Sequence, residues 1–145
     1  MPANQRTSAG LEYGSTVSGK MYLSKDKHRG NGSREHKSMW CILPDTEYDI
    51  FCNSDKHNMC DSNQDYWGVL EGGKAKLGEK GERISKFPCT SNETDHWHGY
   101  PVFPVEERQG ARGSLPPDFD DLIAEWIKSK IIAKEFGKKI LQEKK

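Results

Sequence analysis

The clearest periodic pattern in this 145-residue chain lies near its C-terminus. Five apolar side chains recur there at the i, i+3, i+4, i+7 and i+8 spacing of a helix: Phe119, Leu122, Ile123, Trp126 and Ile127. Asp118 stands where a helix N-cap is expected, and the acidic residues after it suit the positive end of a helix dipole. Further apolar residues extend the pattern, and a break near residues 129–130 would give two short helices instead of one long helix. We therefore predict a helix or a helical hairpin within residues 118–143.

Short β-prone runs separated by turn signals precede these helices. Residues 39–43 and 48–52 are joined by Pro-Asp-Thr-Glu, which predicts a hairpin. Further strands are predicted within residues 19–23, 66–70 and 83–87. Because a sheet with one solvated face needs a cover, the C-terminal helical region is expected to supply it. The predicted fold class is α+β: a small antiparallel sheet of four to six strands covered by a C-terminal helix or helical hairpin.

Length and composition indicate one domain with long polar loops. Hydrophobic residues make up 33% of the chain and charged residues 30%, and there are 14 glycines. Residues 1–15 are small and polar, so we expect a loosely ordered N-terminal segment there. Residues 16–145 are then expected to form a single α+β domain.

The sequence offers no sign of export or membrane insertion. No run approaches the ~18 apolar residues of a membrane span, and the first residues lack the apolar run of a signal peptide. We expect a soluble, cytoplasmic protein with no membrane partner. Its four cysteines are then expected to be reduced, and the pattern does not indicate an oligomeric state.

Charge is distributed unevenly although the formal net charge is zero. Residues 1–40 carry seven Lys/Arg against three acidic residues, and residues 128–145 carry seven against two. The intervening residues 41–127 carry eight against seventeen. Basic ends can hold a nucleic acid or a protein partner. They can equally lie in solvent or against the acidic middle of the chain.

Residues 95–101, Asp-His-Trp-His-Gly-Tyr-Pro, form the stretch richest in side chains that can perform chemistry. In a strand, His96 and His98 project from one face and Trp97 from the other. Because imidazoles titrate near neutral pH, the pair could act as acid and base around a phosphodiester. Arg83 is a candidate to stabilise the charge that develops on the phosphate.

Two other interpretations of this stretch stay open. The two imidazoles, with the carboxylate of Asp95, have the ligand types of a metal site. Alternatively, the stretch packs a corner of the chain, with Trp97 and Tyr100 as anchors and the glycine allowing the bend.

The polar, glycine-punctuated segment 24–38 contains five cations and two histidines and predicts a long loop. Such a loop can grip a phosphate, or it can simply be solvated. Together with the aromatic stretch, it gives the candidate binding residues: Asp95, Trp97, Tyr100, Lys27, His28, Arg29 and Arg34.

Cys52, His57 and Cys60 have the spacing C-x4-H-x2-C within a polar region. With a fourth ligand from Cys41 or Cys89 they could hold zinc, but the specific C-x2-C signal is missing. We expect no cofactor, with zinc at these three residues as the alternative.

Two functional hypotheses follow from the sequence. The first is a small binding or interaction protein that uses the His-Trp-His-Gly-Tyr-Pro surface and the basic ends. The second is a small phosphodiesterase, metal-independent or metal-assisted, similar to the ribonucleases of bacterial conflict systems, with His96 and His98 as the acid–base pair.

Overall fold

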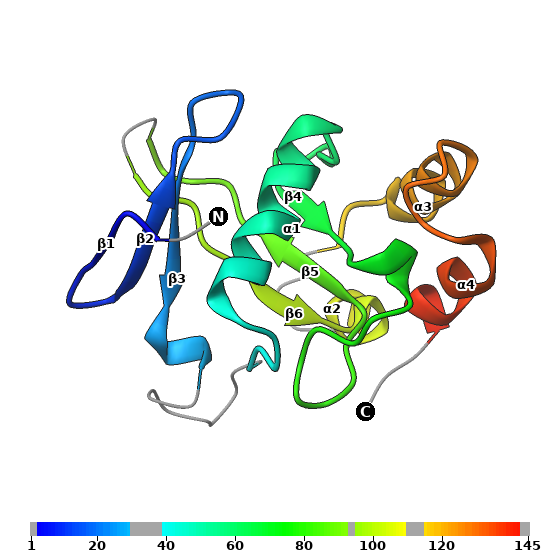
Figure 1. Ribbon diagram of the computed structural model, residues 1–145. Helices are drawn as coiled ribbons and strands as arrows, with labels where there is room; N and C mark the ends of the chain where they lie inside the picture. The colour runs from blue at the N-terminus through cyan, green and yellow to red at the C-terminus, as the bar shows by residue number, and fades with distance from the viewer. Residues whose placement is uncertain (1–2, 30–38, 93–94, 110–114, 143–145) are drawn as a thin grey trace.

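The computed structural model describes residues 3–29, 39–92, 95–109 and 115–142 (Figure 1). The described residues form two three-stranded antiparallel sheets, with strand orders β1-β2-β3 and β4-β5-β6. The fold class is therefore α+β, as predicted, whereas a single sheet of four to six strands is not confirmed. The strands are β1 (Gln5–Arg6), β2 (Gly10–Gly14), β3 (Met21–Lys25), β4 (Tyr66–Gly68), β5 (Ile84–Phe87) and β6 (Tyr100–Val102).

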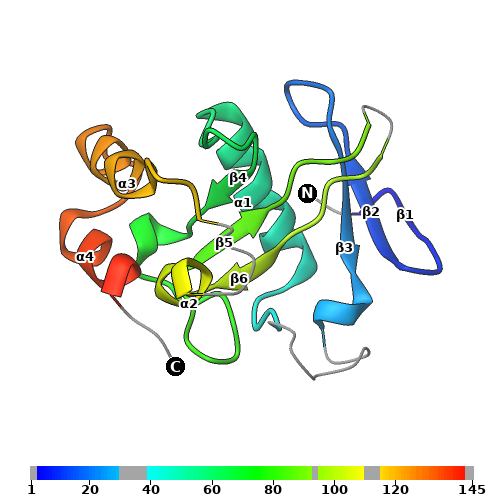
Figure 2. The same ribbon diagram turned by 180° about the vertical axis from the view of Figure 1, so that it is seen from behind.

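Four α-helices and two short 3-10 turns accompany the strands. The helices are α1 (Pro44–Lys56), α2 (Pro104–Gln109), α3 (Phe119–Lys128) and α4 (Lys134–Gln142), and the turns are η1 (Asp26–His28) and η2 (Glu71–Gly73). Figures 1 and 2 show α1 on one face of the second sheet, with α3 and α4 away from the first sheet. No helix in the part of the chain that the structure describes is long and apolar enough to cross a membrane.

The segment around Trp97 links the two sheets. The Trp97 amide donates to the Met21 carbonyl at 2.8 Å, and the Leu23 amide donates to the Trp97 carbonyl at 2.7 Å. These bonds form a parallel bridge beside β3, between Tyr22 and Trp97. The same segment then continues into β6, whose Tyr100 pairs with Lys86 of β5. One short stretch of backbone therefore fixes the first sheet relative to the second.

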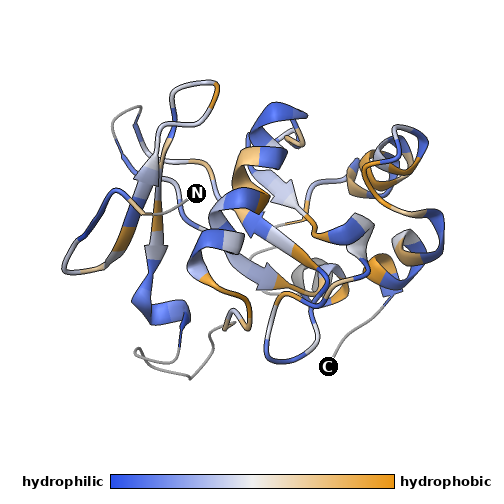
Figure 3. Ribbon diagram, viewed as in Figure 1, coloured by the Kyte–Doolittle hydropathy of each residue, from blue (hydrophilic) through white to orange (hydrophobic). Residues whose placement is uncertain are grey.

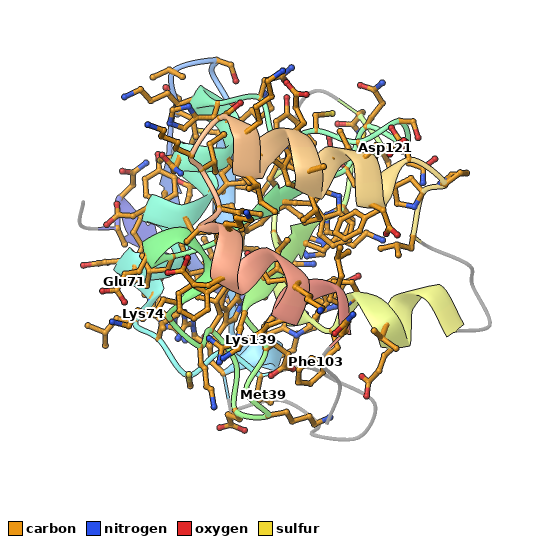
Figure 4. All side chains as sticks on the ribbon, turned by 90° about the vertical axis from the view of Figure 1, so that its right-hand side faces the viewer. Met39, Glu71, Lys74, Phe103, Asp121 and Lys139 are labelled. Carbon is orange, nitrogen blue, oxygen red and sulfur yellow. The ribbon has the colours of Figure 1, made fainter. Side chains whose placement is uncertain are left out.

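Two hydrophobic cores lie on either side of β5. One is rich in aromatic residues and joins the first sheet to α1 and β5, with Tyr22, Phe51 and Phe87 fully buried. The other joins the second sheet to α3 and α4. Figure 3 shows the alternation of apolar and polar residues along these two helices, and Figure 4 shows them in front of the second sheet.

The C-terminal helices confirm the prediction made from their periodicity. The chain breaks between α3 and α4 beyond residue 128, and the two helices pack together. Gly137 lies where they meet, and a Cβ there would lie 2.4 Å from Ile127 Cδ1, so the Ile127 side chain would have to shift. Trp126 is buried in the core that the helices share with the second sheet.

The hairpin predicted within residues 39–52 is wrong, since residues 44–56 form α1. Pro44 stands in the first turn of the helix, where the missing N–H has no intrahelical partner to lose. Tyr48 and Phe51 are three positions apart and both buried, as one face of a helix requires. The sequence interpretation took Pro-Asp as a turn between strands, whereas it starts a helix.

The segment 1–15, expected to be loosely ordered, contains β1 and β2 within the described residues, and the expectation about its order stays a prediction. Tyr13 is fully buried and its ring stacks on Tyr48, with the ring centroids 4.7 Å apart. At Gly10, β3 approaches the backbone so closely that a Cβ would lie 1.9 Å from the Ser24 carbonyl oxygen. The single-domain interpretation of residues 16–145 stays a prediction.

Candidate functional site

Trp97 anchors the stretch that contains both candidate histidines. Its side chain is buried, with ring centroids 5.7 Å from Phe51 and 5.3 Å from Tyr66. Gly99 lies directly against β5, since a Cβ there would be 2.2 Å from Phe87 Cδ1 and 2.8 Å from the Lys86 carbonyl oxygen. The tryptophan and the glycine therefore hold the backbone in place at the residues flanking His98.

His96 and His98 line the same cavity, as the spacing i and i+2 in extended backbone predicts. The cavity has a volume of about 330 Å³. Leu23 and Lys25 of β3 form one part of its wall, and residues 88–91 after β5 form another. We call this the histidine cavity. It brings together three segments that are far apart in the sequence.

Glu12 of β2 orients the His96 ring. His96 Nε2 lies 2.7 Å from Glu12 Oε2, and Gln5 Nε2 donates to the other carboxylate oxygen at 3.0 Å. The hydrogen bond with His96, and to a smaller extent that with Gln5, lowers the pKa of the Glu12 carboxyl below its ordinary value. Because an ionised carboxylate only accepts, the proton in this contact belongs to Nε2. The other ring nitrogen of His96, Nδ1, is therefore the one left to exchange a proton with a ligand.

His98 has a different environment. Burial, followed by the positive charges of Lys25 and Lys27 and by His28, lowers the pKa of His98 to about 4. The ring is therefore neutral at pH 7 and can accept a proton. Its Nδ1 is buried, and it has no hydrogen-bond partner in the described part of the chain. The two imidazoles thus have different environments, since a carboxylate contacts His96 whereas burial and nearby cations act on His98.

Part of the predicted basic loop lies next to these histidines. The His28 ring stacks on Tyr100, with the centroids 5.4 Å apart, and Lys25 and Lys27 affect the pKa of His98. Residues 25–28 and 96–100, which were separate candidates in the sequence, therefore belong to one region.

Arg29 has a structural role instead of a place in this region. Its Nη2 lies 2.6 Å from Glu47 Oε1, and the Glu47 side chain is fully buried. The same carboxylate accepts from Ser24 Oγ at 2.7 Å and from the Tyr22 hydroxyl. This network ties β3 to α1. The remaining candidate of the loop, Arg34, lies outside the described residues.

Arg83 is not brought to the histidines. Its guanidinium donates to the Lys74 carbonyl at 2.7 Å and lies 5.5 Å from the centre of the Phe136 ring. Arg83 precedes β5, whereas the wall of the histidine cavity follows β5. Among the described residues that line this cavity, Lys25 is a cation, and the candidate residues chosen from the sequence did not include it.

The remaining candidates of the aromatic stretch differ in exposure. Asp95 is exposed and lines the histidine cavity, and Tyr100 is half-buried at the start of β6. Trp97 is only 9% exposed, so most of its ring belongs to the core.

Cys52, His57 and Cys60 do not form a metal cluster. No group of three or more His, Cys, Asp or Glu residues that could hold a metal ion occurs among the residues that the structure describes. Cys52 lies in α1, His57 follows the end of that helix, and the Cys60 thiol donates to the Asp61 carbonyl at 3.5 Å. Burial raises the pKa of both thiols, which favours the protonated form that does not bind zinc.

Sequence reasoning missed Glu12 and Lys25. Glu12 lies 84 positions from His96, and nothing local in either segment indicates that they meet. Alternation within a strand predicts that the side chains of Glu12 and Tyr13 point to opposite faces. It does not predict that Glu12 meets His96, which only the structure shows.

Comparisons with protein-family models, with curated proteins and with solved structures found no match to this chain.

Proposed function

We propose that the protein cleaves RNA in the histidine cavity by transferring protons between the two imidazoles. The observation that carries the proposal is the pairing of His96 and His98 in one cavity with different electrostatic environments. His96 contacts the Glu12 carboxylate at 2.7 Å, whereas burial and nearby cations lower the pKa of His98 to about 4. A titratable group with a strongly shifted pKa that lines a cavity beside a second titratable group is typical of a functional site.

The proposal gives each histidine one role. Neutral His98 takes the proton of a ribose 2′-hydroxyl, and the 2′-oxygen attacks phosphorus. His96 starts as the imidazolium in this proposal, with one N–H toward Glu12 and the other at Nδ1. The bond from phosphorus to the 5′-oxygen breaks, and His96 gives that oxygen the proton of Nδ1 and is left neutral. Because Glu12 holds the proton on Nε2, the ring keeps one orientation during the transfer. The products are a 2′,3′-cyclic phosphate and a 5′-hydroxyl end.

Lys25 supplies positive charge to the same cavity. In this proposal it stabilises the negative charge that develops on the non-bridging phosphate oxygens. Lys27 lies close enough to affect His98 and adds to the positive potential that attracts the RNA backbone. The mechanism needs a 2′-hydroxyl, so DNA is not a substrate.

An RNA-cleavage assay in the presence of EDTA tests the proposal. The wild type should convert an end-labelled RNA to fragments that end in a 2′,3′-cyclic phosphate, and an all-deoxy substrate should stay intact. His96→Gln and His98→Gln should each lower the rate by about 100-fold or more, as expected for loss of an acid or a base. The exposed His57 provides a matched control, and His57→Gln should cleave at the wild-type rate.

The same assay separates cleavage from binding. Wild-type rates in both His96→Gln and His98→Gln would overturn the mechanism. The interaction hypothesis is the second candidate, and its support is that Lys27 and His28 lie beside the cavity. Retention of uncleaved RNA by the wild type, lost in Lys27→Gln, would favour that candidate instead.

A further inference from the structure

A second and larger cavity adjoins the histidine cavity. Its volume is about 650 Å³, within the ~300–1,000 Å³ that ligand pockets usually have. Residues 18–21, in and after the turn between β2 and β3, form one wall, and Asn92 and Trp97 contribute to the other. Figures 1 and 2 both show this turn beside the arm that follows β5.

The two cavities adjoin, because Cys89, Thr90 and Asp95 line both of them. A molecule bound in the histidine cavity can therefore extend past these three shared residues into the second cavity. A dinucleotide with its phosphate at the histidines places one of its bases on that side.

The second cavity differs from the first in charge. Its one cation, among the described wall residues, is Lys20, whose Nζ lies 2.8 Å from Asp55 Oδ1 and 2.5 Å from Ser18 Oγ. The Asp55 side chain is only 1% exposed, so this ion pair is built into the fold. Neutralised in this way, the lysine adds no attraction for a second phosphate.

The rest of the lining suits a planar, uncharged group with polar edges. Trp97 contributes the small exposed part of its ring, and Thr90 and Asn92 contribute a hydroxyl and an amide. The Thr90 hydroxyl also donates to the Asn92 carbonyl at 2.8 Å, and Asn92 Oδ1 accepts from the Asp95 amide at 3.0 Å. An aromatic side chain and hydrogen-bonding groups are the combination that holds a splayed-out base of single-stranded RNA.

We propose that the second cavity, which we call the base cavity, binds one nucleobase next to the phosphate held by the histidines. This inference rests on the proposed ribonuclease function and adds a determinant of sequence preference to it. Asn92 lines the base cavity but not the histidine cavity, and its Oδ1 accepts from the amide of Asp95, which lines both.

The test compares Asn92→Ala and Asn92→Trp, in the full chain, on a panel of dinucleoside monophosphates that differ in one base. Asn92→Trp fills the cavity and should raise KM by about 10-fold with little change in kcat, because stacking of one base is lost. Asn92→Ala should reduce the difference in kcat/KM between the preferred base and the others. Asn53, an exposed asparagine of α1 outside both cavities, is the matched control, and Asn53→Trp should behave as the wild type.

The outcomes distinguish the two proposals. RNA cleavage with an unchanged KM and base preference in both Asn92 variants would overturn the base cavity and leave the proposed function standing. No cleavage by the wild type would overturn the proposed function. In that case, the base cavity is tested by adding each of the four nucleosides to the protein and recording the NMR signal of the Trp97 indole N–H. A shift that Asn92→Trp abolishes supports it, and no shift in the wild type overturns it.

Discussion

Glu12 Oε2 and His96 Nε2 lie 2.7 Å apart although 84 positions separate the two residues in the sequence. The contact joins β2 to the segment that carries both candidate histidines. It also lowers the pKa of the Glu12 carboxyl, so the carboxylate is ionised at neutral pH. Glu12 touches the ring and not the substrate, and we therefore treat it as a positioning residue.

Glu12→Gln should lower RNA cleavage by about 10-fold or more, yet by less than the ~10²–10⁴-fold expected for loss of the acid or base itself. The amide of glutamine can keep a hydrogen bond to Nε2, but the negative charge that balances a protonated ring is lost. The pH–rate profile should therefore change shape, which a purely structural role would not produce. Gln5→Ala is the control, since it removes only the bond to the other carboxylate oxygen. An unchanged profile in Glu12→Gln would contradict the positioning role.

The depressed pKa of His98 predicts how stability depends on pH. The folded pKa is about 4, against about 6.5 for a solvated histidine. Between these pH values the unfolded state binds more protons than the folded state, so the free energy of unfolding rises as pH rises from about 4 to 6.5. Above that range His98 adds no further dependence.

Urea unfolding of the wild type and His98→Gln at several pH values between 4 and 7.5 measures this effect. The variant should gain less stability than the wild type as the pH rises. Equal pH dependence in the two proteins would show that His98 titrates normally in the folded state. An NMR titration of the ring of His98 provides the direct check.

The buried pair of Arg29 and Glu47 predicts a large cost when it is broken. Glu47→Ala leaves the guanidinium without its carboxylate and removes the acceptor of the Tyr22 and Ser24 hydroxyls. The free energy of unfolding should fall by about 3–5 kcal/mol, as is typical when one partner of a buried pair is removed. Urea denaturation measures it.

The exposed pair of Arg6 and Asp26 is the matched control for that experiment. Its atoms also lie close together, at 2.5 Å, but both side chains are partly or largely exposed. Because exposed pairs contribute little, Arg6→Met should change the free energy of unfolding by no more than about 1 kcal/mol. Similar costs for Glu47→Ala and Arg6→Met would contradict the importance given to burial.

The sequence was informative where a pattern is local and long. The helical spacing from Phe119 to Ile127 predicts α3, because one face of apolar residues repeats over several turns. The sequence left one helix or a helical hairpin open, and the structure has two helices. The segment of α1 is more ambiguous. Its short apolar runs fit a strand as well as a helix, and Pro44 marks a turn and a helix start equally well.

The candidate site was predicted only in part, because its decisive contacts are not local. The spacing of His96 and His98 indicates a shared face, and the structure places both in one cavity. No local pattern indicates that Glu12 meets His96, or that Arg29 turns toward Glu47 and away from the cavity. The exposure of a side chain is equally hard to predict from the sequence. Trp97 is a residue type that often binds ligands, but the structure buries most of it in the core.

Gly99 provides a test of how tightly the histidine stretch is held. A Cβ at this position would lie 2.2 Å from Phe87 Cδ1 and 2.8 Å from the Lys86 carbonyl oxygen, and the backbone oxygen cannot move as a flexible side chain can. Gly99→Ala should therefore destabilise the fold by about 1–3 kcal/mol through overpacking. It should also displace the neighbouring His98, so RNA cleavage should fall in protein that is still folded at 25 °C. Thermal unfolding and the cleavage assay, made on the same preparation, separate the two effects. A variant with wild-type stability would mean that the stretch can move away from β5, and that the backbone does not fix the histidines as the packing indicates.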